Sequence, residues 1–357
     1  MRARGRSWLL LFLLLVLTSD TNNALSLTAK ARKFLSRRPQ GKSETSIPTS
    51  DEVAKALNVR PGSHAPRIMW RYSWKIHGWS LPLLHCFDKA AARDFDYSLK
   101  CLWCKALAGR DTKSPVYDDG IAYDMLPSGS RWIFKLPNRI FPRLIHFNIE
   151  LRTAYLDNAL RQEIAANEGK KIRLITLGAG YDARSVRFLT DGVIDEAWEL
   201  DITAVLDSKV IMLDRLLKRR PSCVLPKIVS VDLNDVDTFR DLRLNGIVSS
   251  DTNWHTIFLL EGVLIYLDEG IPDKVLSVCS NILQERGLSG SLVFADLLRG
   301  IPDGNFEMAK DRLDGDGWQL VESSWCVKPG LARHMGTARV EASDASRIGV
   351  PDGSIDR

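Results

Sequence analysis

The sequence predicts an α/β protein with a doubly wound sheet and an N-terminal helical cap. Beyond Lys171, short runs of β-branched and apolar residues alternate with amphipathic stretches, a pattern typical of parallel strands joined by crossover helices. The first run ends in the glycine-rich turn Gly178-Ala179-Gly180, and acidic residues follow the later runs. The 357 residues, 45% of them hydrophobic, are enough for one large domain or two ordinary ones.

Five strands and four intervening helices are expected. The predicted strands are 172–177, 196–200, 227–231, 255–260 and 291–295. The predicted helices are 183–189, 204–217, 236–242 and 271–284, and the last has apolar residues at helical spacing. A doubly wound sheet binds ligands beyond the carboxyl ends of its strands, so the functional site is expected at that edge.

The region before the sheet predicts a helical cap over residues 61–160, because it is irregular and aromatic-rich and has no strand alternation. The sheet domain is expected to span residues 161–336. Residues 337–357 are expected to form a disordered polar tail. Within this tail, residues 341–357 are too polar and too rich in Gly and Asp to supply a closing strand.

The N-terminus has the layout of a signal peptide, expected over residues 1–24. Arg2, Arg4 and Arg6 precede an apolar run over 8–17. This run is too short to cross a hydrocarbon core of about 30 Å at about 1.5 Å per residue, so no stable membrane span is expected after processing. Residues 25–60 form a basic segment typical of a transit peptide or a linker. We expect entry into the secretory pathway, with a complex plastid, the endoplasmic reticulum or secretion as the destination.

The positive charge of the chain is concentrated in these N-terminal segments. Residues 1–50 contain nine Lys or Arg and two acids, a balance of +7, whereas the whole chain carries +5, which leaves −2 for the remainder. That remainder has no electrostatic footprint for nucleic acid. Six cysteines are too few for a disulfide scaffold. Cys101 and Cys104 have C-x-x-C spacing but no second pair or clustered His, so we expect buried thiols on a helix and no metal.

The glycine-rich turn alone does not define the ligand. Glycine lets the backbone turn sharply and approach a ligand that a Cβ would exclude. With Ala183 the turn completes G-x-G-x-x-A, and Glu199 and Asp201 follow at roughly the spacing of about twenty residues that a dinucleotide fingerprint has. An NAD(P)-dependent oxidoreductase is therefore one alternative.

Asp182 favours a different cofactor, because a carboxylate in this turn would repel a pyrophosphate. S-adenosylmethionine has no phosphate and carries a sulfonium and an ammonium. Five acids are expected to line one crevice: Asp182, Glu199, Asp201, Asp232 and Glu261. An acid after the second strand suits ribose hydroxyls, Asp232 the adenine amino group, and Glu261 or Asp182 the cationic methionine end. A non-catalytic Rossmann-like binding protein, whose acids only cap helices, is a third alternative.

Several motifs resemble those of the leucine carboxyl methyltransferase family, and they occur in the same order and with the same spacing. They are Leu177-Gly-Ala-Gly-Tyr-Asp-Ala-Arg184, Glu199-Leu-Asp201, Val231-Asp-Leu233 and Leu260-Glu-Gly-Val-Leu-Ile-Tyr266. Upstream, Arg152-Thr153 with Asp157 resembles the family's R-T-x-x-x-D segment, and Lys105-Ala106 resembles an earlier basic motif. The resemblance covers roughly residues 99–336.

The resemblance implies a Rossmann-like methyltransferase sheet that binds S-adenosylmethionine. The planar fork of Arg152 suits the cofactor carboxylate, and Lys105 would have a similar role. The remaining implied contacts are the turn Gly178-Ala179-Gly180 with the cofactor backbone, Asp201 with the ribose, Asp232 and Leu233 with the adenine, and Glu261 with the methionine end.

The acceptor is less constrained. Methyl transfer from a sulfonium is an in-line displacement, and a carboxylate acceptor needs no catalytic base. A hydroxyl acceptor usually needs a catalytic base. His146 and Tyr266 are the nearest candidates for that base, but residues of these types are more often structural. No catalytic residue is therefore assigned. The best-known branch of the family methylates the C-terminal carboxylate of a cytosolic or nuclear phosphatase subunit. The predicted signal peptide and basic segment therefore favour O-methylation of a small-molecule or carboxylate acceptor, with protein C-terminal carboxyl methylation as the alternative.

Overall fold

The computed structural model describes residues 96–108, 120–128, 147–248, 250–302, 305–327 and 334–341, all within one structural unit of the chain. The predicted signal peptide, the basic segment and residues 61–95 of the predicted cap lie outside these residues. The helices are α5 (Asp96–Ala108), α6 (Gly120–Met125), α7 (Phe147–Ala166), α8 (Arg184–Thr190), α9 (Thr203–Leu217), α10 (Val236–Thr238), η3 (Phe239–Leu244), α11 (Asn245–Ile247), η4 (Leu264–Tyr266), α12 (Ile271–Glu285), α13 (Phe306–Gly315) and η5 (Glu322–Ser324). No described helix is long and apolar enough to span a membrane.

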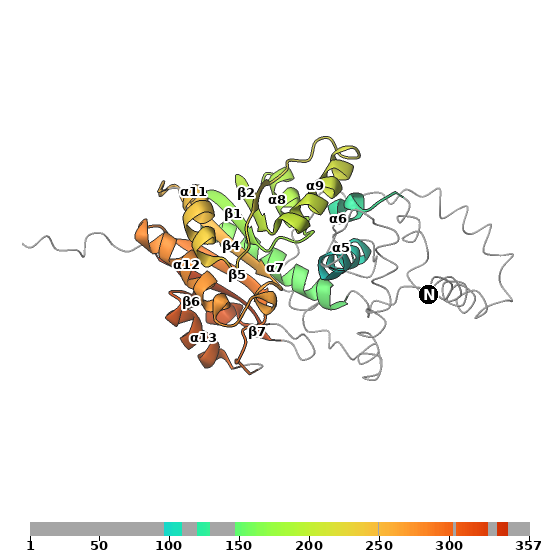
Figure 1. Cartoon of the computed structure of the whole chain (residues 1–357). Coiled ribbons are helices and arrows are strands. Elements are labelled where there is room, and N and C mark those ends of the chain that lie inside the picture. The colour runs from blue at the N-terminus through green and yellow to red at the C-terminus, as the bar shows by residue number, and fades with distance from the viewer. Residues whose placement is uncertain are drawn as a thin grey trace, which may run out of the picture. The chain divides into compact units, whose positions relative to one another are not determined.

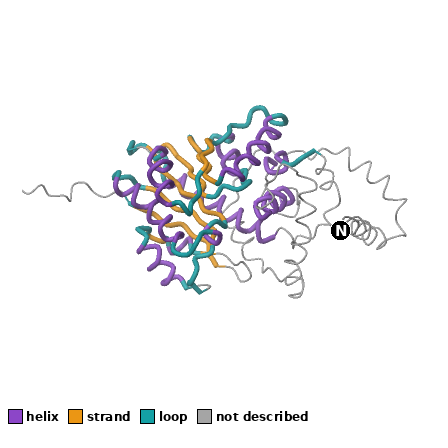
Figure 2. Tube along the Cα trace, viewed as in Figure 1, coloured by secondary structure: helices purple, strands orange, loops and turns teal. Residues whose placement is uncertain are grey.

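A mixed sheet forms the centre of the described fold (Figures 1 and 2). Its strands are β1 (Lys171–Leu177), β2 (Glu196–Asp201), β3 (Lys227–Ser230), β4 (Trp254–Glu261), β5 (Gly290–Asp296), β6 (Gln319–Leu320), β7 (Cys326–Val327) and β8 (His334–Val340). Their order is β3-β2-β1-β4-β5-β8-β6, with β7 also paired to β8. Strands β1 to β5 are parallel, and β8 is antiparallel to β5. The order reverses between β1 and β4, and this is the point at which doubly wound sheets bind ligands.

Both faces of the sheet are covered, which explains why the central strands are continuous apolar runs. On β1, Ile175 and Leu177 pack in a core cluster with α12, while Ile172 and Leu174 pack in a second cluster with α7. Because successive strand residues point to opposite faces, each strand contributes to both layers. A third cluster joins α5 and α6 to α9.

The doubly wound α/β fold predicted from the sequence is confirmed. The five predicted strands are present, and every observed end lies within one residue of the prediction. The predicted helix 236–242 is instead divided into α10, the π-helical segment η3 and α11. Asp235 caps the first piece, its carboxylate accepting the backbone N–H of Thr238 at 3.1 Å.

Two predicted boundaries are wrong. The cap was expected to end at residue 160, but helix α7 continues past this position. It belongs to the sheet domain, because Leu156, Ala159 and Leu160 pack on β1, β4 and β5. The sheet also continues past residue 336, since β8 runs to Val340 and pairs with β5 throughout. The closing strand therefore precedes the polar tail, and residues 342–357 lie outside the described residues.

Candidate functional site

The candidate site lies at the carboxyl ends of β1, β2 and β4. Leu177 pairs in register with Leu200 of β2 and Leu260 of β4, so the residues that follow these three positions are neighbours in space. The turn after β1 therefore meets Asp201 on one side and Glu261 on the other. The sheet topology alone brings these segments together.

The turn after β1 needs its glycines. Gly178 has φ +61° and Gly180 has φ +48°, both in the left-handed region that favours glycine. A Cβ on Gly178 would also lie 2.5 Å from a methyl carbon of Val263. Between the two glycines, the N–H of Ala179 donates to the carbonyl of Leu200 at 3.1 Å, which ties the turn to β2.

Asp201 fixes the turn from the end of β2. Its carboxylate accepts the N–H of Gly180 at 2.7 Å and that of Ile202 at 2.8 Å. The side chain is half-buried, and burial raises its pKa despite these donors. Asp232, which follows β3, is exposed and accepts the N–H of Asn234 at 2.9 Å, while the adjacent Leu233 is buried. Both carboxylates lie at the strand ends where the sequence predicts them.

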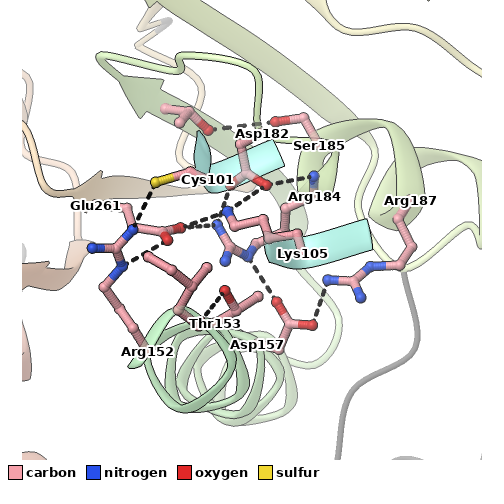
Figure 3. Close-up of polar contacts among 12 residues, drawn as sticks. Cys101, Lys105, Arg152, Thr153, Asp157, Asp182, Arg184, Ser185, Arg187 and Glu261 are labelled. Atoms are coloured by element: carbon pink, nitrogen blue, oxygen red, sulfur yellow. Dashed lines mark hydrogen bonds and ion pairs between the residues drawn. The ribbon is translucent and has the colours of Figure 1, made fainter. Parts of the chain in front are cut away.

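Glu261, the last residue of β4, is surrounded by three cations (Figure 3). Its Oε1 accepts Arg152 Nε at 2.8 Å, and its Oε2 accepts Lys105 Nζ at 3.1 Å and Arg184 Nη1 at 3.0 Å. Burial disfavours the charged carboxylate, but these cations outweigh it and hold the pKa of Glu261 well below its ordinary value. Glu261 is therefore ionised at neutral pH.

Asp182 belongs to the same cluster. It contacts Arg184 and lies 3.0 Å from Lys105 Nζ. Burial opposes ionisation of Asp182, and Arg184 and Lys105 reverse the effect, so its pKa is lowered. Its charge is paired with these two cations, which offset part of the repulsion that the carboxylate would exert on a phosphate in this turn.

Helix α7 supplies both a cation and an acid to the cluster. Arg152 comes from its second turn, and Asp157 accepts Arg184 Nε at 2.7 Å and also contacts Arg187. Burial disfavours the charge of Arg152, but Glu261 and Cys101 raise its pKa, so the guanidinium stays protonated. The R-T-x-x-x-D segment thus places Arg152 beside Glu261 and Asp157 beside Arg184.

Glu199 does not line the crevice, and this prediction is wrong. It lies inside β2, is fully buried, and forms an ion pair with Lys209 of α9 at 2.6 Å. Burial raises its pKa, and Lys209 opposes this rise. Strand position alone placed Glu199 near the ligand, but Lys209 holds its carboxylate in the interior.

The described residues fit the methionine end and the ribose of S-adenosylmethionine. A cation and an acid, Arg152 and Glu261, stand side by side and complement a carboxylate next to an ammonium. At the end of β2, the half-buried carboxylate of Asp201 is an acceptor group that suits ribose hydroxyls. When bound, the cofactor supplies the methyl group on its sulfonium, and the chain binds and orients it.

Arg184 and Asp296 were not predicted as site residues, although both shape this edge of the sheet. Arg184 contacts all three acids of the cluster, Asp157, Asp182 and Glu261, and the spacing D-x-R in the turn was its signal. Asp296 ends β5, is fully buried, and accepts the N–H groups of Val263 at 2.6 Å and Leu264 at 3.0 Å. It therefore holds the turn that follows Glu261.

The cysteines with C-x-x-C spacing and the two candidate bases lie in different parts of the chain. Cys101 and Cys104 lie on α5, and burial raises the pKa of Cys104 to about 12. The described residues contain no group of His, Cys, Asp and Glu that could hold a metal ion. Tyr266 is exposed in η4, and His146 lies outside the described residues.

The fold and this site define a methyltransferase that depends on S-adenosylmethionine. The family model for leucine carboxyl methyltransferase matches residues 98–280, more than half of the chain. The protein belongs to the leucine carboxyl methyltransferase family. No curated protein matches the chain.

Solved structures similar to the chain include methyltransferases of low sequence identity. Magnesium protoporphyrin IX methyltransferase from Synechocystis, solved with bound S-adenosylmethionine, is 11% identical, with 54% of this chain and 81% of that chain covered and a TM-score of 0.37. An O-methyltransferase family protein from Burkholderia thailandensis is 12% identical, with coverage of 77% and 96% and a TM-score of 0.36. An S-adenosylmethionine-dependent methyltransferase from Clostridium acetobutylicum is 12% identical, with coverage of 57% and 96% and a TM-score of 0.37.

Proposed function

We propose that the protein transfers the methyl group of S-adenosylmethionine to an oxygen atom of a small-molecule acceptor, and that a carboxylate is the acceptor group that its site fits best. Membership of the leucine carboxyl methyltransferase family supports methyl transfer to a carboxylate. The signal peptide predicted at residues 1–24, with the basic segment over 25–60, supports an acceptor inside the secretory pathway or a complex plastid.

The observation that carries the choice of a carboxylate is the engagement of the described histidines in structural contacts. His255 is buried on β4 with its Nε2 2.9 Å from Ser291 Oγ, and His334 accepts the N–H of Leu298 at 3.1 Å through Nδ1. Neither imidazole is thereby a ready proton acceptor for a hydroxyl substrate. A carboxylate is already ionised at neutral pH and attacks the methyl group without a base.

Labelled S-adenosylmethionine and the full-length chain test this proposal. The chain is incubated with a metabolite extract, and the products are separated by size and then treated with base. Methyl esters release labelled methanol under base, whereas methyl ethers retain the label. We expect volatile label from the small-molecule fraction with the wild-type chain and none with Gly178→Val, whose side chain would overlap Val263.

The alternative acceptor, a protein C-terminal carboxylate, is tested in the same assay. A peptide that ends in a free leucine carboxylate is compared with the same peptide amidated at its C-terminus. Label on the free peptide alone, without label in the small-molecule fraction, would favour the protein substrate. Base-stable label would instead contradict carboxylate methylation.

A further inference from the structure

Arg184 joins acids that come from three separate elements. Its Nε donates to Asp157 of α7 at 2.7 Å, and its Nη1 donates to Glu261 of β4 at 3.0 Å and also contacts Asp182 after β1. Figure 3 shows the guanidinium between these carboxylates. The side chain is 1% exposed, so its charge depends on these partners for stabilisation.

The other two cations at Glu261 are held differently. Lys105 is shared between Asp182 and Glu261, and Arg152 donates to Glu261 through Nε and contacts Cys101 through Nη2 at 3.5 Å. A ligand carboxylate competes for Arg152, because a guanidinium binds a carboxylate through two parallel hydrogen bonds. Arg184 has two further acids as partners, and these keep it in place when Arg152 changes partner.

We propose that Arg184 is a positioning residue that fixes the carboxylate of Glu261 for the ammonium group of S-adenosylmethionine; the inference rests on the proposed function. The two oxygens of Glu261 have separate partners. Oε1 accepts Arg152, and Oε2 accepts Lys105 and Arg184. When Arg152 turns to the cofactor carboxylate, Oε1 becomes available to the cofactor ammonium, while Arg184 still holds Oε2. The zwitterionic end of the cofactor thus replaces one internal ion pair.

Binding of two ligands distinguishes a role of Arg184 in positioning Glu261 from a general role in supporting the fold. S-adenosylhomocysteine has the amino and carboxylate groups, whereas 5′-methylthioadenosine keeps the adenosine and lacks both. Calorimetric titration of the full-length chain compares the wild type with Arg184→Gln and Arg184→Lys. The matched control is Arg187→Gln, which removes another α8 guanidinium that contacts Asp157.

We expect Arg184→Gln to weaken S-adenosylhomocysteine binding at least about tenfold, as loss of a buried charge partner implies, and to change 5′-methylthioadenosine binding less than about threefold. Arg184→Lys keeps the charge but not the fork, and it is expected to recover part of the loss. Arg187→Gln is expected to leave the ratio of the two affinities unchanged.

Equal weakening of both ligands by the Arg184 variants, or the same selective loss in Arg187→Gln, would overturn the inference. If Arg184→Gln does not fold, as circular dichroism would show, Arg184→Lys decides by the same ratio. A wild-type chain that binds neither ligand overturns the proposed function itself. Binding of both ligands by the wild type with no selective loss in the variants overturns only the role of Arg184.

Discussion

Gly178 is under two independent constraints, one from its backbone and one from its neighbour. Its φ of +61° costs any other residue strain, and a Cβ would meet Val263 at 2.5 Å. Gly192 has a similar φ of +66° but nothing within 4 Å of its hypothetical Cβ. The two glycines therefore separate backbone strain from steric overlap.

We predict that Gly192→Ala lowers the free energy of unfolding by about 1 kcal/mol, and that Gly178→Ala lowers it by roughly 1–3 kcal/mol more. Chemical denaturation of both variants measures the difference. Adding Val263→Ala to Gly178→Ala is expected to restore most of the additional loss. Equal destabilisation by the two glycine variants would show that the contact with Val263 has no energetic weight.

The buried pair of Glu199 and Lys209 supplies a second test at this scale. Removing one charge leaves the other uncompensated in the interior, so Glu199→Gln is predicted to cost about 3–5 kcal/mol. The double variant Glu199→Leu, Lys209→Met removes both charges and is expected to cost much less. Thermal unfolding of the single and double variants measures this. A double variant that is no more stable than Glu199→Gln would contradict the pairing.

Helix α7 connects the site to the opposite end of the sheet. Arg152 near its start and Asp157 at its middle contact the charge cluster. Near its end, the buried Glu163 accepts Ser291 Oγ at 2.6 Å and Arg339 Nη2 at 2.6 Å. His255 of β4 shares Ser291 with Glu163. The helix therefore forms polar contacts with the sheet at both of its ends.

This network predicts a pH dependence of stability. Burial lowers the pKa of His255 from 6.5 to about 4, with Glu163 opposing the shift and Lys170 and Arg339 adding to it. The unfolded chain binds a proton at a higher pH than the folded chain, so stability falls as the pH decreases from about 6.5 to about 4, by roughly 3 kcal/mol from this group. Chemical denaturation at several pH values in this range should show that the free energy of unfolding falls less steeply with decreasing pH in His255→Gln than in the wild type. Identical slopes would contradict the buried neutral imidazole.

At the scale of the whole molecule, binding of the cofactor is predicted to stabilise the fold. A ligand at about one hundred times its dissociation constant adds about 2.7 kcal/mol, which is roughly 5 °C or more in the melting temperature of a domain of this class. Thermal shift with S-adenosylhomocysteine measures this for the wild type and for Asp201→Ala, which loses the carboxylate that binds Gly180. We expect the shift to be much smaller in the variant. A shift of equal size would remove Asp201 from the binding site.

The sheet could be predicted from sequence because each central strand is an apolar run buried on both faces and bounded by a turn. The site could be predicted only in part. Asp201 and Glu261 end their strands and Asp232 follows one, so their place depends on local sequence. The pairing of Asp182 and the burial of Glu199 depend on Lys105 and Lys209, which the fold brings from other elements. No local pattern identifies such partners.

The far edge of the sheet has a bearing on self-association. Strand β8 is seven residues long, but its outer side pairs with β6 and β7, which are two residues each. Long unpaired strands invite other chains to add to a sheet, and very short edge strands discourage this. Because β6 and β7 each offer only a few backbone donors and acceptors, this side of the sheet is a poor template for β-sheet extension by a second copy.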